Sequence, residues 1–323
     1  MSEQQSQQES SDISENMPPK KVKKWYQRVG RLLLFYVVVP YLILFVLLGI
    51  FQRNLLYHRG QVSALLSKDN TPSDIIVRDI QVSTEGDLKV NGWHYLPSSQ
   101  KSNGGKLKEN EWLVLYFPGN AGNRARRLYL PQSLVGINFH LMICDYRGYA
   151  DNPGTPSEQA LFTDAEALWK FAIEEKGASP ERIIIYGESL GGGVATHLAS
   201  FACQNKKPPA GLLLSSTFSS MADAAANLYP FFPVRLLLLD QYNSAEKIKH
   251  VTCPVMQIHG TLDRIVSLEI GKKLFNATPE KSSSGVKKQF EELSDSGHNN
   301  IPVSVIIKSI QILAKMPPYR VEQ

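Results

Sequence analysis

Cysteine is scarce in this chain, which has only Cys144, Cys203 and Cys253 among its 323 residues. An odd number excludes a fully paired disulfide framework. Free cysteine is among the most buried residue types, so we expect these residues to pack in the core, although an oxidising compartment would still allow one bridge. Their spacing fits no metal site, and we predict neither a metal nor a cofactor.

Charge of either sign is also in short supply. Charged residues make up 20% of the chain, and the formal net charge is only +5. No basic recognition helix is visible, which argues against a nucleic-acid partner. Hydrophobic residues make up 43%, an ordinary share for a globular protein, and the length suits one large domain or two small ones.

A long stretch without any charge runs from Leu32 to Phe51. At a rise of about 1.5 Å per residue it reaches about 30 Å, the thickness of a bilayer core. A signal peptide would have a shorter apolar run and an A-x-A-like cleavage site, and a buried helix of this length would normally carry a polar face. We therefore predict that residues 32–51 form one transmembrane helix that acts as a signal anchor.

Basic residues without an acid among them gather directly before this run: Lys20, Lys21, Lys23, Lys24, Arg28 and Arg31. On their own they would fit a solvated tail or a nuclear address. Next to an apolar span, the positive-inside rule places residues 1–31 in the cytoplasm as a disordered basic tail. The rest of the chain is then expected on the non-cytoplasmic side, in a periplasm or a lumen.

Strand-like and helix-like segments alternate over residues 52–323. The expected strands cover residues 75–82, 88–96, 112–117, 139–144, 182–186, 212–214, 255–259 and 289–293, and the longer helices cover 121–134, 157–175, 189–203 and 299–315. The first two strands form a hairpin, and runs such as WLVLYF (112–117) and RIIIY (182–186) are continuously apolar, as is typical of strands covered on both faces. This order predicts an α/β domain with a mostly parallel central sheet and helices on both faces, whose ligands bind at the carboxyl ends of the strands.

One strand end carries the pattern G-x-S-x-G, as Gly187-Glu188-Ser189-Leu190-Gly191. It stands between the apolar run RIIIY and a helix that begins with small residues, which is the strand–turn–helix context of a nucleophile elbow. Such a turn lifts a serine hydroxyl into the open, so Ser189 is the candidate nucleophile. The plainer interpretation is an ordinary glycine-rich turn.

A serine hydroxyl needs a base, and the base needs an orienting acid. Of seven histidines, His298 lies in the loop after the last strand, where the chain order Ser…Asp…His requires it. Asp263 follows another strand end and is the candidate acid, although a turn-stabilising role would also suit it. Asp240 and Asp295 compete with it, but the first lies in a helical stretch and the second is very close to His298 in the sequence.

Two backbone N–H groups are needed to stabilise an oxyanion. Leu190 follows the nucleophile, and Asn120 lies in the loop Pro118–Asn123 after an earlier strand, so we predict that they form the oxyanion hole. The same loop could instead cap a helix, and the two roles are compatible. No Gly-Lys-Ser/Thr follows, which excludes a phosphate-binding loop.

Several strings resemble one known family. FPGNAGN (117–123), DYRGYADNPGTPSE (145–158), YGESLGGGVA (186–195), LYPFFPVRLLLLDQYNSAEKI (228–248) and HGTLDRIVS (259–267) look like Bem46-type, ABHD13-like α/β hydrolases. The similarity runs from about residue 52 to the end of the chain. It implies the α/β-hydrolase fold, a Ser189–Asp263–His298 triad and an oxyanion pair of Asn120 and Leu190. One departure is Pro118, where the family usually has histidine.

A small cap is expected at about residues 218–250, above the site. Its aromatic residues Tyr229, Phe231 and Phe232 are candidates for substrate binding in an apolar acyl pocket, and core packing is the alternative.

These residues and the resemblance imply a membrane-anchored serine hydrolase that cleaves a carboxylic ester or thioester, of a small molecule or of an acylated or lipid substrate, through an acyl-enzyme. A serine peptidase or amidase could use the same triad, and an inactive, membrane-tethered interaction domain is a third hypothesis. The sequence does not indicate an oligomeric state.

Overall fold

The computed structural model describes residues 22–73, 75–97, 105–135, 137 and 139–316. Its contacts divide the chain into two compact units, residues 1–50 and residues 51–323.

The first unit is helical over its described part. α2 (Val22–Leu33) is followed by a π-helical turn (Leu34–Val38) and by α3 (Val39–Leu56), whose last residues belong to the second unit. The stretch Lys24–Leu56 is long and apolar enough to cross a membrane, and none of its most apolar window is buried in protein. The predicted span 32–51 lies inside it.

The expected disordered tail over residues 1–31 is wrong for its last ten residues, because the helix already begins at Val22. Extending an existing helix costs little, and the lysine, arginine and glutamine side chains of residues 22–31 are good helix formers. Residues 1–21 lie outside the described part.

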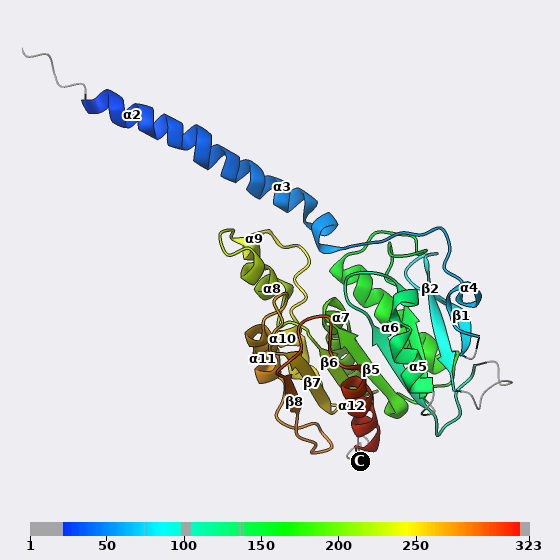
Figure 1. Ribbon diagram of the computed structural model, residues 1–323. Helices are drawn as coiled ribbons and strands as arrows, with labels where there is room; N and C mark the ends of the chain where they lie inside the picture. Colours follow the sequence, from blue (N-terminus) through cyan, green and yellow to red (C-terminus); the bar gives the residue numbers. More distant parts are fainter. Residues whose placement is uncertain (1–21, 74, 98–104, 136, 138, 317–323) are drawn as a thin grey trace, which may run out of the picture. The chain divides into compact units, whose positions relative to one another are not determined.

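The second unit contains a sheet of eight strands in the order β1-β2-β4-β3-β5-β6-β7-β8 (Figure 1). The strands are β1 (Ile76–Ser83), β2 (Lys89–Leu96), β3 (Trp112–Phe117), β4 (Phe139–Cys144), β5 (Ile183–Glu188), β6 (Gly211–Ser215), β7 (Val255–Gly260) and β8 (Gln289–Leu293). β1 and β2 form the expected antiparallel hairpin, and β2 also pairs antiparallel with β4. β3 to β8 are parallel, which confirms the predicted mostly parallel sheet.

The longer helices of this unit are α6 (Glu158–Glu174), α7 (Leu190–Gln204), α11 (Leu268–Ala277) and α12 (Val303–Lys315). Shorter helices are α4 (Ser67–Asn70), α5 (Tyr129–Val135), α8 (Met221–Leu228), α9 (Val234–Leu237) and α10 (Ser244–Lys247), with 3₁₀ turns at Arg124–Arg127, Pro180–Arg182 and Ile248–His250. The helix expected over 121–134 is therefore split, because Asn123 caps a 3₁₀ turn by accepting a hydrogen bond from the N–H of Ala125 at 3.2 Å. The last helix begins at Val303, after Pro302.

Alternate residues of the central strands supply two separate cores, one on each face of the sheet. In β3, Leu113 and Leu115 join the core that holds α6, α7 and α11, whereas Val114 and Tyr116 join the core that holds α5 and α12. Because successive side chains of a strand point to opposite faces, a strand covered on both sides must be apolar throughout. The uninterrupted apolar runs of the sequence predicted this arrangement.

Two buried histidines join β2 to its neighbour β4. His94 Nε2 lies 3.0 Å from His140 Nδ1, and His140 Nε2 lies 3.3 Å from Glu111 Oε2. An ionised Glu111 carboxylate has no hydrogen to donate, so His140 carries its hydrogen on Nε2 and donates it to Glu111. His140 Nδ1 is then unprotonated and accepts from the Nε2–H of His94. Burial lowers the pKa of both histidines below the usual 6.5, and for His94 the neighbouring His140 lowers it further.

This pair makes the stability of the domain depend on pH. Below about pH 6.5 the unfolded histidines bind protons that the folded pair does not, so the free energy of unfolding falls as the pH drops. Replacing His94 by Gln keeps an N–H donor in a similar place but removes the titration. We expect His94→Gln to flatten the pH dependence between about pH 7 and pH 5 by up to about 1.4 kcal/mol per pH unit, measured by denaturant unfolding.

The matched control is His250→Gln, because His250 is exposed. It should leave the pH dependence as it is in the parent protein. Equal slopes for the parent and His94→Gln would contradict the assignment.

Candidate active site

Ser189 occupies the sharp turn between β5 and α7. Its backbone angles are φ 52° and ψ −118°, a left-handed conformation that costs a residue other than glycine about 1–3 kcal/mol. Neighbouring groups hold it there: its N–H donates to Ser215 O at 3.0 Å, and its carbonyl accepts from Gly192 N at 2.9 Å and from Thr217 Oγ1 at 2.8 Å. The turn has the geometry expected of a nucleophile elbow.

The glycines around Ser189 are required by close backbone contacts. A Cβ on Gly191 would lie 2.0 Å from the carbonyl oxygen of Phe117 in β3, and one on Gly187 would lie 2.5 Å from Ala195 Cβ. Gly192, outside the G-x-S-x-G pattern, is equally restricted, because its Cβ would lie 2.1 Å from Thr217 Oγ1. These three crowded positions therefore let the chain turn directly against the end of β3 and the segment that follows β6.

The structure brings the three predicted triad side chains together. His298, in the loop after β8, places Nε2 2.9 Å from Ser189 Oγ and Nδ1 2.8 Å from Asp263 Oδ2. If Asp263 is ionised, Nδ1 must carry the hydrogen, which leaves Nε2 free to accept from the serine hydroxyl. This is the tautomer that a general base needs.

Asp263 is held as a charged acceptor. Its Oδ1 accepts from the N–H groups of Ile265 at 2.9 Å and Val266 at 2.8 Å. Burial raises the pKa of Asp263, but hydrogen bonds from His259, His298 and Val266 outweigh burial and hold the pKa below its usual value. The carboxylate therefore stays ionised throughout the neutral range, where it can stabilise a charged imidazole.

The competing acids have other partners. Asp240 forms an ion pair with Arg53 at 2.9 Å, and exposed Asp295 accepts from Ser294 Oγ at 3.3 Å. Of the three candidates, Asp263 is the one that the structure places against His298.

His259 is a member of the site that the sequence analysis did not single out. It is fully buried at the end of β7, with Nε2 2.9 Å from Val266 O and 3.4 Å from Asp263 Oδ2. It therefore supports the loop that presents Asp263. The sequence did offer one indication of this role, because His259 is the penultimate residue of a strand and precedes Asp263 by four residues.

The two predicted oxyanion donors lie on adjoining segments. Leu190 N–H is the first of α7, and Asn120 follows Gly119, whose Cβ would lie 3.5 Å from Ser189 Cβ. In the described part of the chain, neither the Leu190 N–H nor the Asn120 N–H donates a hydrogen bond within the protein. Both are free to bind a ligand oxygen, as N–H groups at a helix start and in a glycine-rich loop commonly do.

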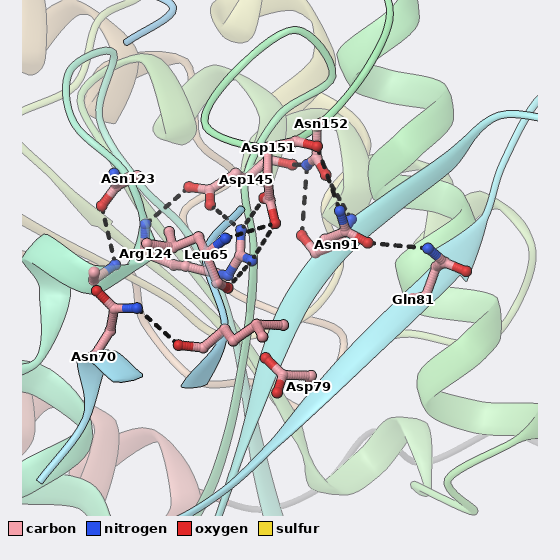
Figure 2. A network of polar contacts seen from close by, with 12 residues as sticks. Leu65, Asn70, Asp79, Gln81, Asn91, Asn123, Arg124, Asp145, Asp151 and Asn152 are labelled. Carbon is pink, nitrogen blue, oxygen red and sulfur yellow. Dashed lines mark hydrogen bonds and ion pairs between the residues drawn. The ribbon is translucent and has the colours of Figure 1, made fainter. Parts of the chain in front are cut away.

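A buried arginine connects this loop to the loop that follows β4 (Figure 2). Arg124, 1% exposed, donates through Nη1 to Asp145 at 2.6 Å and to Asp151 at 2.7 Å, and through Nη2 to Leu65 O at 2.6 Å. Asp145 and Asp151 belong to the loop after β4, so the loops that follow β3 and β4 are joined. The carbonyl of Pro118 accepts from Tyr146 OH at 2.7 Å, a bond that proline allows because it uses no N–H.

The segment 218–250, which is the expected cap, contains α8, α9, α10 and the 3₁₀ turn Ile248–His250. Tyr229 is 48% exposed and Phe231 is 87% exposed, so core packing is the wrong interpretation for both. Phe232 is half-buried. A substrate-binding role for these three residues stays a prediction. Large apolar residues nearby are also exposed, namely Leu228, Leu236 and Leu239.

Comparison with known proteins finds one matching family model and several relatives. Residues 108–240 match the family described as serine aminopeptidase, S33. An uncharacterized protein of Mycobacterium tuberculosis is 38% identical over 249 residues, which cover 77% of this chain and 81% of the relative. The mouse lysophosphatidylserine lipase ABHD12 is 34% identical over 231 residues, which cover 64% of this chain but only 58% of the lipase.

Solved structures share the fold at low identity. An α/β hydrolase from Vibrio vulnificus has a TM-score of 0.63 at 21% identity and covers 82% of this chain and 92% of its own. The Pyrococcus furiosus esterase Pf2001 has a TM-score of 0.58 at 16% identity and covers 80% and 96%. With this fold and these relatives, the chain belongs to the α/β-hydrolase superfamily as an esterase- or lipase-like hydrolase with an N-terminal apolar helix.

Proposed function

We propose that the chain hydrolyses a carboxylic ester or thioester through an acyl-enzyme formed on Ser189. One observation carries the proposal: the unbroken chain of hydrogen bonds from Ser189 Oγ through the His298 ring to Asp263, with steps of 2.9 and 2.8 Å. Nucleophile, base and orienting acid are then in reach of one another without any movement.

The reaction would run in two halves. Ser189 Oγ attacks the carbonyl carbon while His298 Nε2 takes the hydroxyl proton and then returns it to the leaving oxygen or sulfur. The N–H groups of Leu190 and Asn120 stabilise the oxyanion, and the Asp263 carboxylate stabilises the charged imidazole. Water, activated by the same histidine, releases the acid and restores Ser189.

A lipid with a single acyl chain is the substrate class that we propose. The ABHD12 relatives are named lysophosphatidylserine lipases, and the chain carries an apolar helix long enough to span a bilayer. Leu236 is 84% exposed and Leu239 is 65% exposed on the cap, where a lipid surface would remove them from water. The cap would then receive its substrate from the membrane.

A peptidase or amidase is the second candidate. The matching family is described as a serine aminopeptidase, and its match covers β3, the elbow and most of the cap. The same triad can cleave an amide, so substrate preference decides between the two reactions. Comparing kcat/KM for p-nitrophenyl esters of several chain lengths with that for aminoacyl p-nitroanilides would separate them.

We predict that the triad variants lose activity in a defined order. Ser189→Ala should abolish both ester hydrolysis and covalent labelling by a fluorophosphonate. Asp263→Asn should lower kcat by about 10⁴-fold, because an amide in this place favours the wrong tautomer of His298. Initial rates with p-nitrophenyl butyrate and gel-based labelling measure both effects.

Asp295→Asn is the matched control, since Asp295 is the exposed acid nearest to His298 in the sequence. It should keep kcat close to that of the parent. Full labelling of Ser189→Ala would refute the proposed nucleophile, and inactive Asp295→Asn would refute the assignment of the acid.

Charges on the cap are predicted to separate lipid from soluble substrates. The double variant Leu236→Glu/Leu239→Glu replaces the two apolar side chains that would contact lipid by carboxylates. Full burial of one such side chain is worth about 1.5–3 kcal/mol, and each substitution loses part of this binding energy. Hydrolysis of a lysophospholipid in vesicles should fall by roughly tenfold or more, while hydrolysis of a short soluble ester is retained.

Leu66→Glu serves as the control, because Leu66 is also exposed but lies beside α4, away from the cap. It should affect neither substrate. A parallel loss of both activities in the cap variant would show damage to the active site instead of a lipid contact.

The positive-inside rule supports a cytoplasmic N-terminus and a hydrolase domain on the opposite side. In sealed right-side-out membrane vesicles, external protease is then expected to digest the hydrolase domain and to spare an N-terminal tag. A protected hydrolase domain would reverse the proposed orientation.

A further inference from the structure

The segment that follows the apolar span is part of the hydrolase unit. We name residues 51–62 the juxtamembrane segment; it lies wholly within that unit. Gln52 Oε1 accepts from the N–H of Leu239 at 2.8 Å, and Arg53 forms two hydrogen bonds with Asp240, at 2.9 and 3.1 Å. This end of the segment is joined to the last part of the cap.

Its second half is bound equally closely. Tyr57 is 2% exposed, and its hydroxyl lies 3.0 Å from that of Tyr242. Ala150, in the loop after β4, donates to Arg59 O at 3.3 Å and accepts from Val62 N at 3.0 Å. Bonds of this number and burial are typical of an integral structural element and not of a flexible linker.

Between these two attachments, the segment holds the side chain of Asn120. The Asn120 Nδ2 group donates to Leu56 O, at the last residue of α3, and to His58 Nδ1 at 2.9 Å. The Asn120 Oδ1 atom accepts from His58 N at 3.3 Å and from Tyr149 OH at 2.6 Å. The nitrogen and the oxygen of the Asn120 amide therefore each form two hydrogen bonds. Three of these four bonds are with residues 56–58.

The backbone on either side of Asn120 is held through carbonyl groups, because Pro118 O accepts from Tyr146 OH at 2.7 Å and Ala121 O accepts from Arg127 Nη2 at 2.8 Å. In the described part of the chain, no backbone N–H between residues 119 and 122 donates a hydrogen bond. Gly122 has φ +84°, and Gly119 lacks a side chain that could anchor the loop. The orientation of the Asn120 N–H therefore depends strongly on what its own side chain binds.

We propose that residues Leu56–His58, the last residue of α3 and the two that follow it, are a positioning element for the oxyanion hole. It acts through the Asn120 side chain, and it aims the Asn120 N–H at the position of the developing negative charge. The role rests on the proposed esterase reaction, and His58 is a positioning residue that does not touch the substrate. The end of the membrane anchor and the catalytic loop then form one rigid unit.

The hydrogen-bond pattern also defines which substitutes will serve. The Asn120 Nδ2 group is a donor, so His58 must offer an unprotonated Nδ1 as acceptor. Asparagine can place its Oδ1 close to the position of Nδ1, whereas glutamine places its amide about one bond farther out. His58→Asn and His58→Gln therefore differ in one contact and otherwise match in chemistry.

The test compares these two variants in the full-length protein in detergent, with a soluble p-nitrophenyl ester. His58→Gln should lower kcat by about tenfold and change KM by less than about twofold, because the lost alignment acts on the transition state. His58→Asn should recover most of kcat. His250→Gln, at an exposed histidine, is the matched control and should equal the parent.

A double-mutant cycle identifies the path of the effect. If His58 acts through Asn120, then His58→Gln should lower kcat in the parent but cause little further loss in Asn120→Ala. Additive losses would overturn the proposal, as would a His58→Gln variant with the kcat of the parent. Equal losses of kcat and of thermal stability in His58→Asn and His58→Gln would show a merely structural role.

The outcomes separate this inference from the proposed function. An inactive parent protein, or an active Ser189→Ala variant, would remove the esterase proposal itself. An active parent with a normal His58→Gln variant would remove only the positioning role.

Discussion

The close approach of the β5–α7 turn to the end of β3 is the constraint on which the site depends. Gly191 packs against the carbonyl of Phe117 so tightly that a single Cβ would overlap it. This contact fixes Ser189 in its left-handed conformation and also sets where the chain leaves β3, and so where Pro118–Asn123 begins. This backbone contact sets where the loop of Asn120 starts relative to Ser189, whereas the contacts of the Asn120 side chain orient the middle of that loop.

Opposite this rigid turn, the proposed base and acid lie in loops that side chains organise. Asp263 is placed by two N–H groups of its own loop and by buried His259, and its carboxylate binds the ring of His298 on the side away from Ser189. The net lowering of the pKa of Asp263 is the electrostatic result of the same contacts. Geometry and charge are thus set together, since each hydrogen bond that holds the carboxylate in place also favours its ionised form.

The sequence predicted those parts of the structure that follow from strand order. Parallel strands end at one edge of a sheet, so Ser189, Asp263 and His298 could be assigned from their positions after apolar runs. The extent of the first helix and the split of the segment 121–134 were mispredicted, because they depend on propagation from the span and on one capping asparagine. His259 and His58 were missed for another reason: each acts on a residue of the site through a tertiary contact that leaves no periodic pattern in the sequence.

Because tertiary contacts leave no pattern in the sequence, the anchor helix and the candidate site seemed separate there. An apolar span and a catalytic domain can be joined by any linker, and the letters FQRNLLYHRG carry no motif. The structure instead uses the carbonyl of Leu56 at the end of α3, which needs a donor as helix ends do, and Asn120 supplies that donor. One hydrogen bond thus caps the helix end and also holds the loop that carries Asn120.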